Sequence, residues 1–224
     1  YVNAFFTSAN ALVLIYAVLA VAGTHGKTTT SSMLMLILAE AGLRPSFVIG
    51  GHVNDMGTGA QWTGGEWFVV EADESDATHL ELPLHGTIVT NIDVDHLDLY
   101  ETIDGVERAF DQYLAQIPGP KVVSADDERS RRVAARHGAR TYGLAADADV
   151  RATDLVADRG SFRFAIVSDG VEVARVRLPL RGEHNVANAT GAFAMALAIG
   201  VEPEIAARAL AKFGGVARRF DVRG

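Results

Sequence analysis

Ala22-Gly23-Thr24-His25-Gly26-Lys27-Thr28-Thr29-Thr30 is the stretch on which the fold of this chain depends. An apolar run, Leu12–Ala22, precedes it, and a run with the composition of a helix, Thr29–Ala41, follows it. A strand, a glycine turn, a lysine, a hydroxyl residue and a helix, in that order, are typical of a phosphate-binding loop. The stretch therefore predicts an α/β fold with a site for a phosphorylated ligand at its first helix.

Each residue type in this stretch suits phosphate binding. Gly23 and Gly26 permit a tight turn with inward-pointing N–H groups, and the helix start adds a partial positive charge. Lys27 supplies a mobile charge for terminal phosphates, and the Thr28 hydroxyl can bind Mg²⁺. The usual pattern has a further glycine where this chain has Val21. The shorter form leaves open a helix start with a chance glycine pair, but Lys and Thr at the required positions favour the phosphate loop.

The overall composition is that of a globular protein without disulfides. The chain has 224 residues, of which 49% are hydrophobic and 21% charged, enough for one large α/β domain or two small ones. A net charge of −8 disfavours nucleic acid as a partner. The absence of cysteine excludes thiolate metal sites and fits a reducing compartment, so we expect a cytoplasmic protein.

The first 22 residues carry no charge and could be interpreted as a membrane span or a signal segment. No basic residue flanks their start, and four polar residues interrupt the first half: Asn3, Thr7, Ser8 and Asn10. We therefore expect no membrane span and interpret Val18–Ala22 as the buried first strand of a parallel sheet. Residues 1–17 remain an unassigned lead-in.

Polar residues follow two further predicted strands. Trp67–Val70 leads into Glu71-Ala72-Asp73-Glu74-Ser75-Asp76, and Thr87–Thr90 leads into Asn91–Asp98, which contains His96. Carboxylates at the end of a buried strand are costly unless they face a cation or solvent, and ligands bind at this edge of parallel sheets. The pattern predicts a magnesium site with a carboxylate and, through a neutral ring nitrogen, His96. A solvated acidic turn and a structural histidine are the alternatives.

The remaining segments define the fold class. Gly50–Ala60, with four glycines among eleven residues, predicts a long loop, either functional or a mobile surface loop. Helices and strands then alternate over Thr102–Ile117, Lys121–Ser124, Asp126–His137 and Arg140–Tyr142. Val150–Leu180 alternates apolar and polar side chains between turn signals, which predicts an insert of three antiparallel strands over residues from about 147 to 182. We predict a doubly wound, mostly parallel P-loop sheet flanked by helices, with a small antiparallel β-sheet subdomain; two helices, from Arg181 to Ile199 and over Glu204–Phe213, follow it.

Five separated motifs together resemble the Mur ligase family, whose members form amide bonds of the bacterial cell-wall peptide at the expense of ATP. They are GTHGKTTT (23–30), EADESD (71–76), TNIDVDHLD (90–98), HNVANA (184–189) and RRF (218–220). The resemblance extends from about residue 18 to the end. With GGHVNDMGTGA (50–60) it is greatest to the branch that joins L-alanine to UDP-N-acetylmuramate through an acyl phosphate.

The resemblance implies ATP and Mg²⁺ as cofactors, UDP-N-acetylmuramate and L-alanine as partners, and a role for each motif residue. Lys27 would hold the β- and γ-phosphates, Thr28 and Glu71 one magnesium ion, and His96 with Glu71 a second. Asn185 and Asn188 fall where the family contacts adenine, and Arg219 falls where it contacts phosphates. The rest of the implied ATP site is the loop itself: Gly23, Thr24, His25, Gly26 and Thr29.

The sequence departs from the family pattern in its limits and in one lysine. Many members carry a carbamylated lysine after the His96 motif, whereas this chain has none between His96 and Lys121. Residues 18–224 resemble the middle of three domains, so the UDP-binding and amino-acid-binding domains are expected to be absent. We therefore expect a fragment that binds Mg-ATP weakly and does not complete ligation.

Three alternatives stay open at the level of sequence. A sibling ligase that attaches a tripeptide to UDP-N-acetylmuramate shares the GTHGKT form, but the residues after Glu71-Ala72-Asp73 favour the L-alanine branch. A P-loop kinase or GTPase is disfavoured because the chain has no N-K-x-D motif and no arginine-rich lid segment. A nucleotide-binding module without catalysis has less use for His96 and two acidic strand ends.

Overall fold

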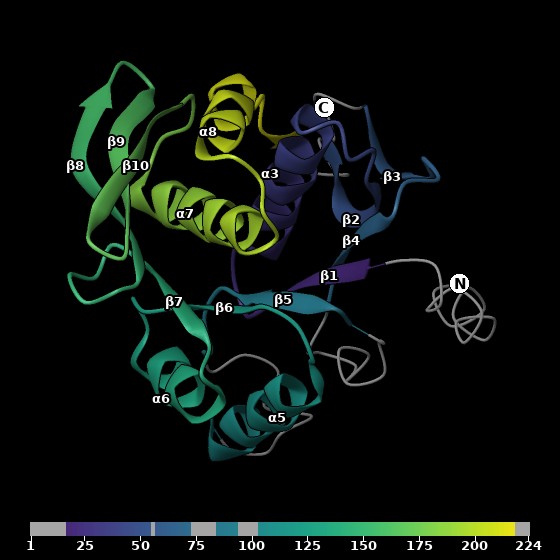
Figure 1. The fold of residues 1–224 in the computed structure, drawn as a ribbon, viewed down its shortest axis with the longest axis vertical. Helices are drawn as coiled ribbons and strands as arrows, with labels where there is room; N and C mark the ends of the chain where they lie inside the picture. The colour runs from purple at the N-terminus through teal and green to yellow at the C-terminus, as the bar shows by residue number, and fades with distance from the viewer. Residues whose placement is uncertain (1–16, 55–56, 73–83, 94–102, 218–224) are drawn as a thin grey trace, which may run out of the picture.

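The computed structural model describes residues 17–54, 57–72, 84–93 and 103–217, which form one mixed β-sheet with helices on both faces (Figure 1). The strands are β1 (Ala17–Ala22), β2 (Ser46–Val53), β3 (Thr58–Gln61), β4 (Trp67–Glu71), β5 (Gly86–Val89), β6 (Lys121–Ser124), β7 (Arg140–Gly143), β8 (Val150–Asp158), β9 (Ser161–Ser168), β10 (Val171–Leu178) and β11 (Val216–Ala217). The helices are α3 (Lys27–Glu40), α5 (Ile103–Gln116), α6 (Glu128–His137), α7 (Glu183–Ala198) and α8 (Pro203–Lys212).

β1 lies in the middle of the parallel part of the sheet. Parallel pairing runs through β8, β7, β6, β5, β1, β4 and β2 in that order. The register pairs Val21 with Glu71 of β4 and Ala22 with Val89 of β5. The carboxyl ends of β1, β4 and β5 therefore meet at one edge of the sheet, which is the edge where ligands bind in such folds.

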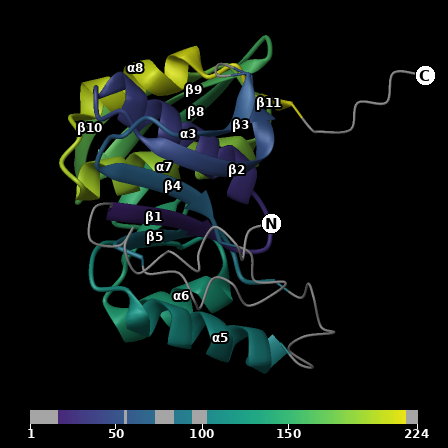
Figure 2. The same ribbon diagram turned by 90° about the vertical axis from the view of Figure 1, so that its right-hand side faces the viewer.

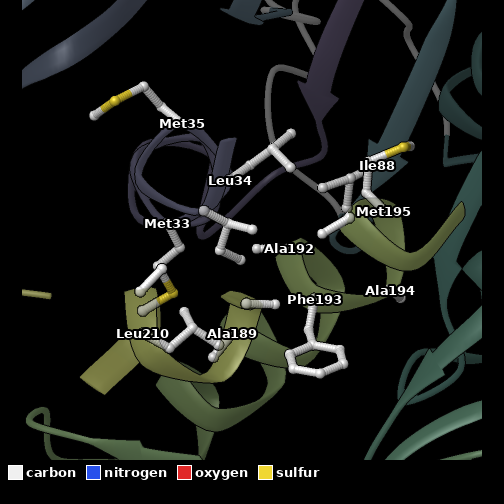
Figure 3. Close-up of a cluster of buried hydrophobic side chains, with 14 of the residues drawn as sticks. Met33, Leu34, Met35, Ile88, Ala189, Ala192, Phe193, Ala194, Met195 and Leu210 are labelled. Carbon is white, nitrogen blue, oxygen red and sulfur yellow. The ribbon is translucent and has the colours of Figure 1, made fainter. Parts of the chain in front are cut away.

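Helices α3, α7 and α8 cover one face of the sheet, and α5 and α6 cover the other (Figures 1 and 2). The layer formed by α3, α7 and α8 packs mainly through methionine, leucine and alanine side chains. Figure 3 shows Met33 and Leu34 of α3, Ala192 of α7 and Leu210 of α8 gathered around a shared interior. All four are fully buried, so α3 is enclosed rather than amphipathic, as its long apolar sequence requires.

The second layer has its own core. Ala20, Val89 and Val123 point from the sheet toward Phe110 and Tyr113 of α5. The Tyr113 hydroxyl lies 2.7 Å from the Thr87 hydroxyl of β5, so its polar end is satisfied inside the core. The alternation of helices and strands predicted from sequence is confirmed, with helices on both faces.

The three antiparallel strands predicted between about 147 and 182 are present and continue the main sheet. β8 pairs in parallel with β7, and β9 and β10 follow as an antiparallel meander, with α8 lying against β10. The predicted fold class, a mostly parallel sheet with an antiparallel part, is confirmed, and the antiparallel part shares its hydrogen-bond ladder with the parallel part.

The prediction of a loop over Gly50–Ala60 is wrong for most of its length. β2 extends to Val53, and β3 pairs antiparallel with it. A Cβ at Gly59 would lie 2.6 Å from the Gly51 oxygen and 2.9 Å from the Ile49 oxygen, so this glycine permits close strand approach. Residues 55–56, between the two strands, lie outside the described part of the chain.

Within the described residues, no helix has the length and apolar character needed to cross a membrane. The lead-in, residues 1–17, lies outside them except for Ala17, where β1 begins.

Candidate nucleotide-phosphate site

The predicted phosphate loop connects β1 to α3 and folds back onto the end of β5. Gly23 and Gly26 have φ values of 121° and 86°, which favour glycine over residues with a side chain. A Cβ at Gly23 would overlap the Thr90 hydroxyl and lie 2.8 Å from the Asn91 oxygen. The loop therefore needs glycine at both positions, as the sequence predicted.

The start of α3 suits an anionic ligand. Its N-cap residue, Gly26, gives no side-chain cap, and its first turn contains no acidic residue. By contrast, Asp127 caps α6 by accepting from the Ser130 N–H at 2.7 Å. The first N–H groups of a helix have no acceptor within the helix, so the start of α3 can donate to phosphate oxygens. Lys27 Nζ donates to the Gly23 carbonyl oxygen at 2.7 Å, which keeps the ammonium group over the loop.

Glu71, at the end of β4, reaches the loop and is held at both carboxylate oxygens. Thr28 Oγ1 donates to Oε2 at 3.2 Å, and the Gly50 N–H donates to Oε1 at 2.7 Å. Ser31 Oγ lies 3.4 Å from Oε1. Burial raises the pKa of Glu71, and the hydrogen bonds from Gly50 and Thr28 and the charge of Lys27 oppose this effect. A half-buried carboxylate beside a hydroxyl is the kind of group that a cation would stabilise.

The Thr28–Glu71 pair fits a magnesium ion by its oxygen spacing. The two oxygens lie 3.2 Å apart, and adjacent oxygens around octahedral Mg²⁺ lie about 3.0 Å apart when each is about 2.1 Å from the ion. Among the described residues no cluster of three or more His, Asp or Glu side chains forms a protein-only metal cage. One hydroxyl and one carboxylate, completed by phosphate oxygens and water, match the usual coordination of Mg²⁺ in nucleotide sites.

Asn91 is hydrogen-bonded to the crest of the phosphate loop, which consists of Thr24 and His25. The sequence did not predict this contact. Asn91 Oδ1 accepts from the His25 N–H at 2.9 Å, and Asn91 Nδ2 donates to the His25 oxygen at 3.0 Å. The Asn91 carbonyl oxygen also accepts from the Thr24 N–H at 3.2 Å. The Asp93 N–H donates to Thr24 Oγ1 at 3.0 Å. The segment after β5 therefore holds both residues of the crest.

α7 approaches the loop from the other side. A Cβ on Gly26 would lie 2.5 Å from Asn188 Oδ1, so the Asn188 side chain packs directly on the loop. Asn188 Nδ2 lies 3.4 Å from Asn185 Oδ1, and Asn185 Nδ2 donates to the Arg181 oxygen at 2.7 Å. Asn188 therefore lies beside the phosphate loop, with Asn185 one turn nearer the start of α7.

The structure brings most predicted site residues together at one sheet edge. They are Gly23, Thr24, His25, Gly26, Lys27, Thr28, Thr29, Glu71 and Asn188, with Asn185 adjacent. His96, Arg219 and the carboxylates of residues 73–76 lie outside the described residues. Sequence reasoning missed Asn91, Ser31 and the Gly50 N–H. Ser31 follows Thr28 by three positions, a spacing that places both on one face of α3 and could have identified it.

Comparison with known proteins agrees with the resemblance found in the sequence. The Mur ligase middle domain matches residues 21–196. UDP-N-acetylmuramate–L-alanine ligase of Rhizobium meliloti (strain 1021) is 43% identical over 217 residues, which are 92% of this chain and 46% of that protein. The same-named protein of Xylella fastidiosa (strain M12) is 44% identical over 92% of this chain and 44% of its own length.

Two solved structures have the same fold. UDP-N-acetylmuramate-alanine ligase of Thermotoga maritima superposes with a TM-score of 0.85 at 26% identity, over 98% of this chain and 50% of that one. UDP-N-acetylmuramate:L-alanyl-gamma-D-glutamyl-meso-diaminopimelate ligase of Neisseria meningitides gives 0.82 at 29% identity, over 95% of this chain and 70% of that one. The chain spans about half the length of the curated relatives it matches. By its phosphate loop, its sheet order and the extent of the match, the chain belongs to the Mur ligase family and contains its middle domain.

Proposed function

We propose that this chain is the ATP-binding part of a ligase that joins L-alanine to UDP-N-acetylmuramate through an acyl phosphate. The observation that carries the proposal is the Thr28–Glu71 oxygen pair beside the phosphate loop. The names of the curated relatives support the choice of substrates. The absence of cysteine suits the reducing cytoplasm, where we place this activity.

The reaction needs positioning and charge neutralisation at the γ-phosphate more than covalent help from the protein. A carboxylate of the sugar nucleotide would attack the γ-phosphorus, ADP would leave, and the amine of L-alanine would then displace phosphate from the acyl carbon. Lys27 and the N–H groups at the start of α3 would bind the terminal phosphates. Mg²⁺ on Thr28 and Glu71 would neutralise charge on the β- and γ-phosphates.

The remaining roles belong to the same proposal and rest on motif positions. His96, with Glu71, would contribute to a second magnesium site, and Arg219 would contact the phosphates. Asn185 and Asn188 would contact adenine, and the packing of Asn188 on Gly26 supports a position next to the nucleotide.

The choice of L-alanine over a tripeptide rests on similarity. The curated relatives named for L-alanine are 43% and 44% identical. The solved structures do not separate the two branches, because the alanine ligase is 26% identical and the tripeptide ligase 29%. A phosphate-release assay on the full-length protein that carries this chain, with ATP, Mg²⁺ and UDP-N-acetylmuramate, separates the two. We expect phosphate and a mass-identified amide product with L-alanine and little with the tripeptide.

Two variants make this assay specific for the site. Lys27→Ala should abolish phosphate release, and Lys212→Ala should not change it, because Lys212 pairs with Glu40 at the far end of α3. A preference for the tripeptide would contradict the substrate assignment. Turnover of GTP in place of ATP, or full activity of Lys27→Ala, would contradict the proposed function as a whole.

A further inference from the structure

Four hydrogen bonds join the crest of the phosphate loop to the segment after β5. Two run from Thr24 and His25 N–H groups to Asn91, one runs from the Asn91 amide to the His25 oxygen, and one runs from the Asp93 N–H to Thr24 Oγ1. They extend the β1–β5 contact beyond the ends of both strands. Asn91 takes part in three of the four, two through its side chain and one through its main-chain oxygen, so this residue is the centre of the contact.

The two side-chain bonds of Asn91 fix two successive peptide groups. The His25 N–H belongs to the Thr24–His25 peptide, and the His25 oxygen belongs to the His25–Gly26 peptide. Distances of 2.9 and 3.0 Å satisfy both at once. Only a carboxamide offers an acceptor and a donor side by side, so aspartate, serine or alanine at this position loses at least one of the bonds.

The hydrogen bond from Asn91 to the His25 oxygen determines where the Gly26 N–H points. The chain contains no cis peptide among the described residues, and the C=O and N–H of a trans peptide point in opposite directions. Because the His25 oxygen faces Asn91, the Gly26 N–H faces away from the end of β5. Gly26 is the N-cap of α3, so this N–H lies beside the first N–H groups of that helix.

We propose that Asn91 is a positioning residue for nucleotide binding, which holds the His25–Gly26 peptide so that the Gly26 N–H donates to a phosphate of ATP. The inference rests on the proposed function and extends it to a residue outside the loop. Asn91 acts through the peptide and does not need to touch the nucleotide. Its loss leaves Lys27, Thr28 and Glu71 in place but frees the loop crest to rotate.

The test is calorimetric titration of Mg-ATP into the chain and into Asn91→Ala, Thr87→Val and Lys27→Ala. Thr87→Val is the matched control, because it removes a buried hydrogen bond to Tyr113 from the same strand region without touching the loop. In Asn91→Ala the Gly26 N–H would no longer be aimed at the charged phosphate. We therefore expect the dissociation constant for Mg-ATP to rise about 10- to 100-fold, the effect of losing one hydrogen bond to a charged group. Thr87→Val should bind as the unmodified chain does, although it unfolds more easily.

The NMR chemical shift of the Gly26 amide proton distinguishes a positioning role of Asn91 from a purely structural one. The Gly26 amide proton should move downfield when Mg-ATP binds to the unmodified chain and to Thr87→Val, and this shift should be lost in Asn91→Ala at saturating ligand. Unchanged affinity and an unchanged Gly26 shift in Asn91→Ala would overturn the inference. Equal weakening in Asn91→Ala and Thr87→Val would also overturn it, because the effect would then be one of stability. Normal binding by Lys27→Ala would instead overturn the proposed phosphate site itself.

Discussion

Glu71 is both a candidate magnesium ligand and a half-buried carboxylate, and the negative charge that would bind magnesium makes the folded chain less stable when no ion is bound. Burial raises its pKa above the usual 4.5, so the folded chain holds the proton more tightly than the unfolded chain. Below pH 4.5 both states are protonated and there is no cost. As the pH rises from 4.5 through the folded pKa, ionisation increasingly destabilises the fold.

Replacing Glu71 with glutamine should therefore separate stability from metal binding. Glu71→Gln keeps an oxygen for the Gly50 N–H but removes the charge. We expect its free energy of unfolding in urea at pH 7 to be equal to or higher than that of the unmodified chain, and the difference to vanish below pH 4.5. We also expect magnesium-dependent ATP affinity to fall at least about 10-fold, because loss of a group that merely supports a metal ligand already costs about 10- to 100-fold. Lower stability at pH 7 with unchanged Mg-ATP affinity would contradict both roles.

Gly26 offers a second test at the scale of one residue. Gly26→Ala must place a residue with a Cβ at φ 86° and 2.5 Å from Asn188 Oδ1. Gly42→Ala, at the other end of α3, meets a similar φ of 75° with nothing within 4 Å of the new Cβ. We expect both to lose about 1 to 2 kcal/mol of unfolding free energy from backbone strain. Gly26→Ala should lose more, because its Cβ overlaps Asn188, and it alone should weaken ATP binding.

A double variant tests whether the overlap with Asn188 causes the additional stability loss of Gly26→Ala. In Gly26→Ala/Asn188→Ala the side-chain overlap is removed while the backbone strain remains. The additional loss of unfolding free energy in Gly26→Ala relative to Gly42→Ala should therefore disappear. If that loss persists in the double variant, the Asn188 contact is not its cause.

Local spacing in the sequence identified residues that the structure brings together at one sheet edge, while their roles in binding stay a prediction. Gly23, Gly26, Lys27 and Thr28 lie in one short motif, and Glu71 follows a strand that the pattern of apolar residues identifies. Asn91 was noted only as one of several polar residues after a strand. Its bonds to His25 join residues 66 apart, and no spacing in the sequence encodes such a contact.

At the scale of elements, α7 packs so closely on β7 that a methyl group matters. A Cβ at Gly191 would lie 2.6 Å from Cζ of the Tyr142 ring, which is fully buried. Alanine is the better helix former by about 1 kcal/mol, but overpacking costs about 1 to 3 kcal/mol. We expect Gly191→Ala to lower the urea midpoint, and Gly191→Ala/Tyr142→Leu to be less destabilised than the sum of its single variants. A higher midpoint for Gly191→Ala would show that the two elements can separate without cost.

The pair α5 and α6 is joined by surface charges and should depend on pH. Glu107 accepts from Arg132 at 2.9 Å and from Arg136 at 3.1 Å. The hydrogen bond from Arg132 is the main reason that the pKa of Glu107 lies below 4.5 in the folded chain. Its contribution is therefore fully present above pH 4.5 and is lost as the pH falls through the folded pKa.

Glu107→Gln should destabilise the chain by about 1 kcal/mol at neutral pH, because such partly exposed pairs contribute little each. The loss should disappear in acid and shrink in high salt. Glu128→Gln is the control, since Glu128 is 87% exposed and accepts from Arg132 one turn away. Denaturation in urea at several pH values checks both expectations. An equal effect of the two variants would contradict a specific contribution of Glu107 to the packing of α5 on α6.

Element order followed from hydrophobic pattern, whereas element limits near glycines did not. Glycines at 50, 51, 57 and 59 favoured a loop, yet β2 and β3 occupy most of that stretch. Gly59 serves close strand approach rather than a turn, and a single sequence does not distinguish the two uses.

The whole molecule gathers the ends of β1, β4 and β5 at one edge, with α3 and α7 beginning there. The predicted antiparallel strands form and join the sheet where β8 pairs with β7. In the strand order, β5 and β6 separate this junction from β1. That junction depends on pairing between distant segments, which turn signals alone do not determine. The location of the candidate site follows from the parallel order, because β1 carries the loop and its two neighbours carry the polar residues.

The central claim is that this edge binds the phosphates of Mg-ATP, and calorimetric titration of ATP with and without magnesium tests it most directly. We expect binding that requires magnesium, is lost in Lys27→Ala and is unchanged in Lys212→Ala. Binding of equal strength without magnesium, or retained by Lys27→Ala, would contradict the claim.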